Sequence, residues 1–194
     1  MTALHLDTTP ELEFVRPYIM QAIPDAEWAG PDQAEAIISL GTAVTAGVPV
    51  LRLDLPHVIG THMTGLPREM VNAIGRGTFF HIPGITRHIN TVHAADVASA
   101  CALLAGENGH YTLTDGSYPT ADDLAEALAA RIDGKRILTM NPRLARWFYG
   151  RRTLDERSTD EERIYIPQIL TERGWRPTPV CDYLRTHIYD ETSL

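Results

Sequence analysis

The sequence predicts an α/β domain built on a parallel sheet, and three observations support this prediction. Short apolar runs alternate along the chain with segments of helical periodicity, as expected when helices connect parallel strands. Turn-forming glycine, proline, asparagine and aspartate residues separate these segments. The chain has 194 residues, of which 44% are hydrophobic, which is enough to bury one sizeable core.

The first quarter of the chain is predicted to contain two strands. Residues 3–7 (ALHLD) form an apolar run typical of a buried strand, and a loop with a short helix at 11–16 follows, because prolines interrupt this stretch. Residues 31–47 place apolar side chains near one helical face, so a helix is preferred there, with a strand at AIISLG as the alternative. Residues 48–55 (VPVLRLDL) are typical of a strand.

The middle of the chain is predicted to run from a loop at 56–67 into a helix at 68–77. Two extended segments follow at 78–84 and 85–93. A helix is then expected at 93–106, with His93 bonding locally at the strand end and Asp96 in the first helical turn, where the helix dipole favours a carboxylate.

The next predicted elements are a strand at 110–115 and a helix at 122–132. Asp115 and Gly116 have the chemistry of a turn in which the glycine takes a positive φ. Thr120 and Asp123 have the spacing of a capping box, with Asp in place of Glu.

The last part of the chain is predicted to be mainly helical. A short strand at 135–140 leads to a helix that begins at Asn141 and Pro142, in which Trp147 and Phe148 are expected to serve packing. Residues 165–191 indicate a helix, a turn and a helix, anchored by Trp175. The expected organisation is a domain at 1–134 and a C-terminal region at 135–194.

Composition limits the classes of partner. A net charge of −8 argues against nucleic acid, which requires a basic face. Five acidic residues closely follow the basic cluster Arg143, Arg146, Arg151 and Arg152, so this surface is expected to pair with itself. No apolar run is long enough to span a membrane, so no membrane partner and a cytoplasmic location are expected. The spacing of Cys101 and Cys181 indicates no zinc site, and Cys101 is expected in the core.

Four segments resemble the extended short-chain dehydrogenase/reductase family, the NAD-dependent epimerase/dehydratases. They are VPVLRLDLPHVIG, NTVHAADVASA, HYTLTDGSYPTADDLAEALA and GWRPTP, and they occur in the family's order. The resemblance implies a truncated Rossmann-type parallel sheet with a small, mostly helical C-terminal remnant of the substrate lobe. Residues 56–90 would be the substrate-lobe insertion, and ALHLD would take the role of the family's fifth strand.

Two parts of the family's chemistry are missing. No glycine-rich GxxGxxG or GxGxxG turn is present to bind a dinucleotide pyrophosphate. Aligning WAGPDQAEA with the family's Tyr-x-x-x-Lys segment places Trp28 at the tyrosine and Asp32 at the lysine. An indole cannot exchange a proton at neutral pH, so no catalytic or cofactor-binding residue is assigned. NAD(P) is expected to bind only if a partner chain or a dimer completes the site.

Four residues are candidates for ligand binding. Thr8 retains a hydroxyl near the position where the family has Ser or Thr. His57 and His62 lie in the loop that, by the resemblance, borders the substrate cleft. Arg87 could clamp a phosphate bidentately, and its alternative role is a surface ion pair. The histidine spacing fits no known metal-ligand set, so no metal is expected.

Three functions follow as hypotheses. The first is a degenerate epimerase/dehydratase-like protein that binds a small molecule or a protein partner. The second is one subunit of a split NAD(P)-dependent oxidoreductase or epimerase acting on a nucleotide-sugar-like substrate, and the third is a structural interaction module. Strand 3–7 is expected at a sheet edge, where it would pair with a second copy or another polypeptide.

Overall fold

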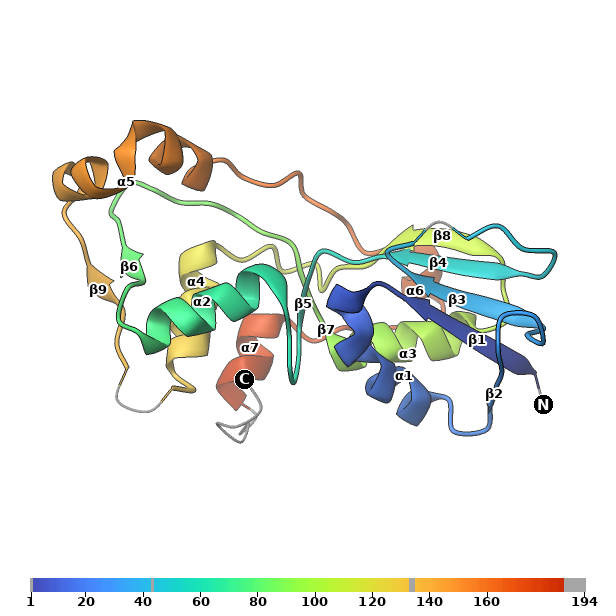
Figure 1. The fold of residues 1–194 in the computed structure, drawn as a ribbon. Helices are drawn as coiled ribbons and strands as arrows, with labels where there is room; N and C mark the ends of the chain where they lie inside the picture. The colour runs from blue at the N-terminus through green and yellow to red at the C-terminus, as the bar shows by residue number, and fades with distance from the viewer. Residues whose placement is uncertain (1, 43, 133–134, 187–194) are drawn as a thin grey trace.

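The computed structural model describes residues 2–42, 44–132 and 135–186, and it contains a five-stranded parallel sheet (Figure 1). The strands lie in the order β2-β1-β3-β4-β8. Two pairs of short parallel strands, β5 with β7 and β6 with β9, lie outside this sheet. The predicted Rossmann-type α/β fold is therefore confirmed. The strands are β1 (Ala3–Thr8), β2 (Glu27–Trp28), β3 (Ala36–Leu40), β4 (Val50–Asp54), β5 (His57–Ile59), β6 (Phe80–His81), β7 (Thr91–His93), β8 (Gly109–Thr112) and β9 (Leu138–Thr139).

Helices flank these strands, and most lie close to their predicted positions. The short helix expected at 11–16 extends to residue 22, because Pro17 lies in the first turn of α1, where a missing N–H is tolerated. The predicted capping box of Thr120 and Asp123 is present at the start of α4. The helices are the 3₁₀ helix η1 (Pro10–Val15), α1 (Arg16–Ala22), α2 (Gly65–Gly75), α3 (Ala94–Leu104), α4 (Ala121–Ala129), α5 (Pro142–Arg157), α6 (Gln168–Glu172) and α7 (Val180–Thr186).

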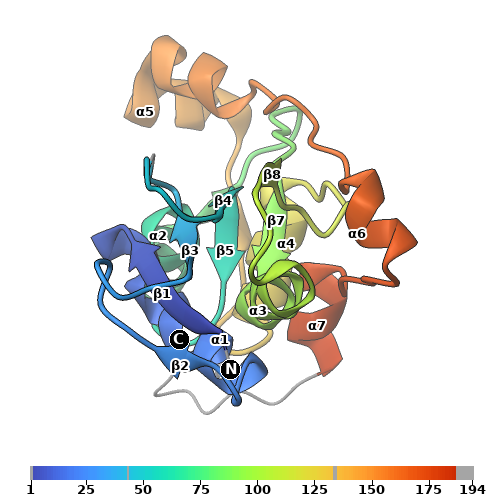
Figure 2. The ribbon, with the colours of Figure 1, turned by 90° about the vertical axis from the view of Figure 1, so that its right-hand side faces the viewer.

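The main core lies between one face of the sheet and helices α1 and α3 (Figures 1 and 2). Strand β4 alternates buried and half-exposed residues, so that Leu51 and Leu53 contribute to this core. Cys101 of α3 is fully buried there, as predicted, and burial raises the pKa of its thiol to about 12. Cys101 is therefore a packing residue rather than a reactive thiol.

The opposite face of the sheet mixes polar and apolar side chains. Asp7, Ser39, Arg52 and His110 occupy paired positions on the adjacent strands β1, β3, β4 and β8. Ile37 and Val50 are paired on the same face, and Ile37 and Ser39 of the central strand β3 are buried. Parallel sheets usually carry apolar side chains on both faces, because crossover helices cover both. Here the second face carries a row of polar side chains as well.

The helix preferred at 31–47 is wrong, and the alternative strand at AIISLG is correct. Residues 36–40 form β3, and all five are buried. A central strand buried on both faces is continuously apolar, so its pattern resembles that of a buried helix. Trp28 therefore lies in β2 and Asp32 in a turn, and the two residues do not share the helix on which a Tyr-x-x-x-Lys pair would be arranged.

The expected edge position of strand 3–7 is also wrong, because β2 pairs outside β1 at Ala3 and Leu4. Arg16 of α1 covers the next free carbonyl, that of Leu6, with Nη2 at 3.4 Å. This strand is therefore second in the sheet, and only a short stretch of its outer side lies beyond β2. After α1 the chain returns to the sheet, and β2 pairs with the outer side of β1. The sequence of residues 3–7 alone does not show this pairing. A protein partner at this strand remains a prediction.

A second core joins α2, α4 and α7 beside the β5–β7 pair. Ile59, Met70, Leu124 and Leu184 are among its buried residues. The loop predicted at 56–67 thus includes β5, and α2 begins three residues earlier than predicted. This core connects α2 and α4 to the C-terminal helix α7, and all three lie on one side of the five-stranded sheet (Figure 1).

A third, small cluster holds α5 against the segment after β6. It consists of Ile82, Ala145 and Leu154. The predicted packing role of Trp147 and Phe148 is wrong, because their exposed fractions are 77% and 61%. Ala145 is the residue of this turn that faces the cluster, and helix geometry turns the two aromatic side chains away from it.

Two carboxylates fasten the C-terminal segment to the body. Asp96 Oδ2 accepts a hydrogen bond from the Thr178 N–H at 3.1 Å, and Asp115 Oδ2 accepts one from the Val180 N–H at 2.8 Å. Burial raises the pKa of Asp96 to about 6; the Thr178 hydrogen bond lowers it, and the nearby Asp115 charge raises it further. Burial thus disfavours the ionised form of Asp96, even though its carboxylate accepts the hydrogen bond that holds the segment before α7.

Asp96→Asn should therefore flatten the pH dependence of stability. Because the folded-state pKa lies above the unfolded value, folding favours the protonated acid, and stability is lost as the pH rises toward and through about 6. Allowing for solvent screening, the wild type should lose about 1 kcal/mol more than Asp96→Asn between about pH 5 and about pH 7.5. Urea unfolding at both pH values measures this difference, and equal pH dependence of the two proteins would contradict it.

Candidate functional site

Two of the four candidate ligand-binding residues, His57 and Arg87, meet at one carboxylate. Glu161, in the segment between α5 and α6, accepts hydrogen bonds at Oε1 from His57 Nε2 and from Arg87 Nη2, each at 2.8 Å. Its Oε2 accepts the Asn90 N–H at 3.0 Å. Sequence reasoning missed Glu161, because it lies more than 70 residues from these partners and within a run of ordinary surface acids.

The three side chains form a largely buried charged group. The exposed fractions are 24% for His57, 31% for Arg87 and 23% for Glu161. Burial raises the pKa of Glu161, but hydrogen bonds from the Asn90 N–H and His57, together with the charge of Arg87, outweigh it, and the pKa lies below its usual value. Glu161 is therefore an anion at neutral pH and holds Arg87 in one orientation.

The segment around Glu161 is bound to residues 88–90, which precede β7. The Asn90 side chain donates to the Glu162 carbonyl at 2.8 Å and accepts the Ile164 N–H at 2.9 Å. Asp160 accepts the His88 N–H at 2.6 Å. An amide side chain can both donate and accept in this way, whereas a carboxylate can only accept. Asn90 thus fixes the position of Glu161.

The other two candidates, Thr8 and His62, are not brought to this group. Thr8 donates its hydroxyl hydrogen to the Glu13 carboxylate at the end of β1. His62 is exposed and has a φ of 61° in the turn before α2. Neither Thr8 nor His62 forms a hydrogen bond with Glu161, so their roles as ligand contacts remain predictions.

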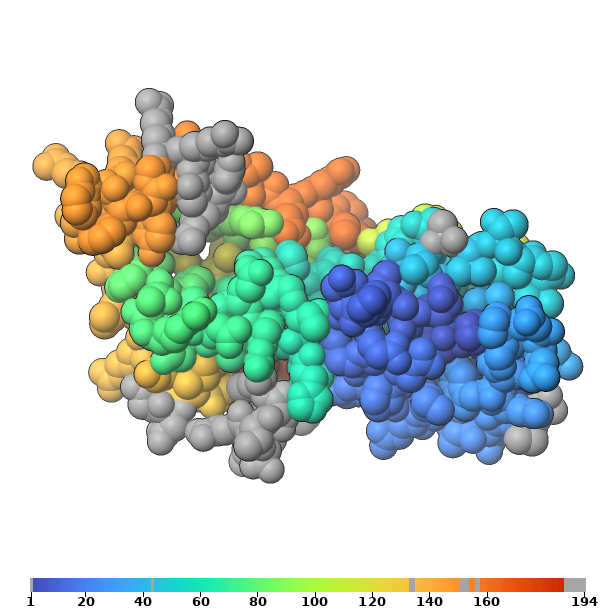
Figure 3. Space-filling view, viewed as in Figure 1, coloured from blue at the N-terminus to red at the C-terminus, as the bar shows by residue number. Residues whose placement is uncertain are grey.

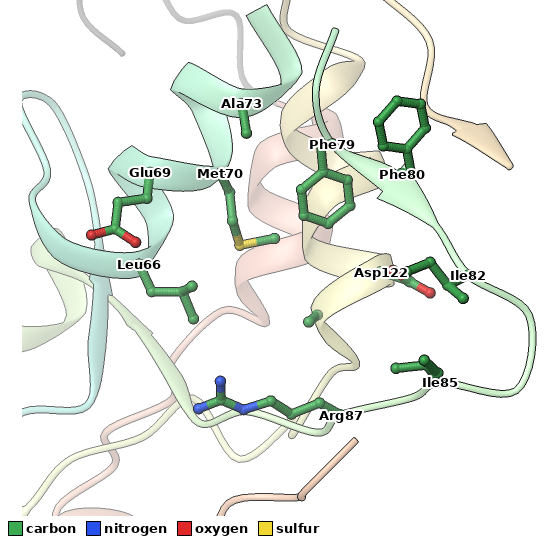
Figure 4. A pocket seen from close by; sticks show the side chains of 11 residues that line it. Leu66, Glu69, Met70, Ala73, Phe79, Phe80, Ile82, Ile85, Arg87 and Asp122 are labelled. Atoms are coloured by element: carbon green, nitrogen blue, oxygen red, sulfur yellow. The ribbon is translucent and has the colours of Figure 1, made fainter. Parts of the chain in front are cut away.

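A cleft of about 400 Å³ opens between α2, β6 and the start of α4 (Figure 4). Leu66 and Met70 line it from α2, and Phe79 and Ile85 line it from the segment around β6. Figure 4 shows Arg87 along the base of this space. The Nε of Arg87 is buried and has no hydrogen-bond partner among the residues that the structure describes. The cleft is thus lined by apolar and aromatic side chains, by the guanidinium of Arg87 at its base, and by the carboxylates of Glu69 and Asp122.

A smaller cleft of about 280 Å³ lies at the carboxyl ends of β1, β3 and β4. Thr9, Gly41 and Leu55 follow these strands and line it, together with His57. Parallel α/β sheets bind ligands at this end of their strands. Leu66 lines both clefts, and Glu161 binds one residue of each, so the charged group lies between them.

The described part of the chain offers no metal centre. Within residues 2–42, 44–132 and 135–186, no group of three or more His, Cys, Asp or Glu side chains could hold a metal ion. None of the helices in these ranges is both long enough and apolar enough to cross a membrane. The ligand chemistry of the two clefts therefore depends on Arg87, His57, the carboxylates of Glu69 and Asp122, and the apolar lining.

A comparison with solved structures finds that this structure is similar to proteins described as epimerases and to MoeE5. A UDP-glucose 4-epimerase of Thermotoga maritima with UDP-glucose is similar, with a TM-score of 0.55, 15% identity and coverage of 94% of this chain and 74% of that chain. The protein MoeE5 in complex with UDP-glucuronic acid and NAD has a TM-score of 0.55 and 16% identity, and the match covers 95% of this chain and 76% of that one.

A human epimerase family protein with NADPH is also similar, with a TM-score of 0.52, 13% identity and coverage of 90% of this chain and 73% of that chain. No protein-family model matches the sequence, and no curated protein matches it. At these identities the likeness concerns the fold alone. The chain therefore has the parallel α/β fold of the NAD-dependent epimerases.

Proposed function

We propose that this chain is a degenerate epimerase/dehydratase-like protein that binds a small anionic ligand in the α2–α4 cleft and is not catalytically competent alone. The observation that carries the proposal is Arg87, which lies at the base of the cleft and has a buried Nε that lacks a partner among the described residues. Glu69 and Asp122 also line the cleft, so Arg87 is the group there that would attract an anion. A buried, unsatisfied donor is costly, and an anion in the cleft would satisfy it.

The cleft suits a ligand with a flat apolar part and an anionic part. Its volume lies in the usual range for small-molecule sites. Phe79 and Phe80 offer rings against which a base can pack, and Arg87 offers a planar donor for a phosphate. Two proteins with this fold were solved with UDP-glucose and with UDP-glucuronic acid. The proposed ligand class is therefore a nucleotide sugar or a similar nucleotide.

Loss of catalysis is supported by two features of this chain. Lys135 is its only lysine, and the residue four positions earlier is Arg131, so no Tyr-x-x-x-Lys pair exists anywhere in the sequence. The connection from β3 to β4 spans residues 41–49 and contains no helix among its described residues. No element is thus available there to carry the proton-transferring pair of the family that the sequence resembles.

The alternative is a subunit of a split NAD(P)-dependent enzyme. The solved structures with NAD and NADPH favour it, since they share this fold. The polar side chains on the second face of the sheet, among them Asp7 and Arg52, argue against it, because a docked helix from a partner would cover them. A structural interaction module is the third possibility, and it requires no ligand in the cleft.

Arg87→Met should weaken the binding of UDP-glucuronic acid, with at least a tenfold rise in Kd. The substitution keeps an unbranched apolar side chain but removes the charge and all donors, and a charge-assisted bidentate contact is worth about 1.5–3 kcal/mol. Isothermal titration calorimetry of the wild type and the variant with UDP-glucose, UDP-glucuronic acid and uridine measures the effect.

The matched control is Arg76→Met, which removes a guanidinium from the exposed end of α2, outside the lining of the cleft. It should leave the Kd unchanged. Absence of binding by the wild type would contradict the proposed function. A parallel fluorescence titration with NADH and NADPH separates the alternatives, since saturable binding by the chain alone would support a rebuilt cofactor site and an enzyme.

A further inference from the structure

The outer side of α5 carries a surface that the proposed function does not use. The exposed fractions of Leu144, Trp147 and Phe148 are 48%, 77% and 61%. The rings of Trp147 and Phe148 pack edge to face, with their centroids 4.8 Å apart. Figure 3 shows α5, in orange, as a raised part of the molecular surface. We call these three residues, together with Arg143 and Arg146, the α5 patch.

Helix geometry places the members of the α5 patch on one side. Leu144, Trp147 and Phe148 stand at i, i+3 and i+4, which forms a single apolar stripe. Arg143 and Arg146 stand one position earlier, at i and i+3, and flank that stripe. Ala145, which lies between them in sequence, is fully buried against the body. The stripe and its basic flank thus face away from the protein.

The charge of this region is opposite to that of the whole chain. Residues 135–150 contain four basic residues and no acidic residue, whereas the net charge of the chain is −8. The expected pairing with the following acids is not realised for Arg143 and Arg146, because Asp160 binds His88, and Glu161 binds His57 and Arg87. No ion pair of Arg143 or Arg146 occurs within the described residues. These cations therefore remain available.

We propose that the α5 patch binds an anionic lipid surface. A short helix with Trp, Phe and Leu on one side and arginine beside them has the composition of a helix that lies in the membrane interface. Lys135, Arg136 and Leu138 precede the patch in the sequence, and they are exposed as well. Basic side chains near the surface add attraction to anionic headgroups.

Binding to a second copy of this chain fits less well. A two-fold contact between two such patches would bring Arg143 and Arg146 of both copies together, and like charges repel. The two exposed rings present on the order of 300 Å², whereas a stable protein interface buries about 800 Å² on each partner. A lipid surface needs no such area. Exposed apolar side chains can insert between the lipids, and several anionic headgroups can attract the basic residues at once.

Vesicle flotation of the full chain tests this proposal. The probes are vesicles of phosphatidylcholine alone and vesicles of equal parts phosphatidylcholine and phosphatidylglycerol. The wild type should float with the anionic vesicles and not with the neutral ones, and added salt should weaken the binding. The tryptophan emission should shift to the blue, because Trp175 is already buried and Trp147 is exposed. Trp28 is half-buried and remains in Trp147→Ser with Phe148→Ser, so loss of the shift in that variant assigns it to Trp147.

Two double variants and one control complete the experiment. Trp147→Ser with Phe148→Ser, and Arg143→Gln with Arg146→Gln, should each weaken binding to anionic vesicles at least tenfold, while circular dichroism confirms the fold. The control Leu103→Ser changes an exposed apolar residue of α3 and should bind like the wild type. Absence of flotation, or equal flotation with neutral vesicles, would overturn the proposal. So would light scattering that shows a dimer which Trp147→Ser with Phe148→Ser converts to a monomer.

Discussion

Trp175→Ala is expected to lower the free energy of unfolding by about 4 kcal/mol. Trp175 is only 3% exposed and belongs to the main core. Its Nε1 donates to the Asp96 carbonyl at 3.1 Å and to Ser99 Oγ at 2.9 Å, so that it ties the turn between α6 and α7 to helix α3. Alanine would leave a large cavity and remove both hydrogen bonds. Urea unfolding followed by circular dichroism measures the loss.

The matched control is Trp147→Ala, which removes the same side chain from the surface. Because Trp147 is 77% exposed, this change should alter the free energy of unfolding by less than about 0.5 kcal/mol. A similar loss of unfolding free energy in both variants would contradict the prediction, because it would mean that Trp147 is as buried as Trp175. That result would also remove the exposed stripe on which the α5 patch depends.

Glu161→Ala should lower the free energy of unfolding by about 3 kcal/mol. The change leaves the half-buried side chains of His57 and Arg87, and the Asn90 N–H, without their shared acceptor. Because the pKa of Glu161 is lowered in the folded state, its contribution is present above the unfolded pKa and is lost as the pH falls through the folded one. The difference between wild type and variant should therefore shrink in acid.

Glu162→Ala is the control for this prediction. Glu162 is the next residue, its side chain is exposed, and it uses its backbone carbonyl rather than its carboxylate to bind Asn90. Its replacement should change the stability by less than about 0.5 kcal/mol. A loss as large as that of Glu161→Ala would mean that net charge, and not the shared acceptor, determines the effect.

Local patterns were sufficient for the elements whose chemistry is short-range. The capping box at Thr120, the positive φ of Gly116, the local hydrogen bond of His93 and the burial of Cys101 were all predicted from neighbouring residues, and all are present. Such features depend on residues within one turn, so the sequence around them contains the whole cause.

Two errors came from patterns that have more than one solution. A continuous apolar run suits a helix or a central strand equally well, and only the neighbours of β3 in the sheet decide for the strand. Trp147 and Phe148 have the composition of packing residues, but their direction depends on which face of α5 meets the body. Periodicity alone does not show which apolar stripe of a helix is covered.

The sequence by itself therefore determined the parallel α/β class, most of the elements and the absence of a Tyr-x-x-x-Lys pair, because these depend on composition and local spacing. It also indicated His57 and Arg87 as candidates for ligand binding. Only the tertiary structure showed that Glu161 joins these two residues, that Arg87 lies at the base of a cleft, and that Trp147 faces outward. Contacts between residues 74 and 104 positions apart arise from the path of the chain, which no local pattern records.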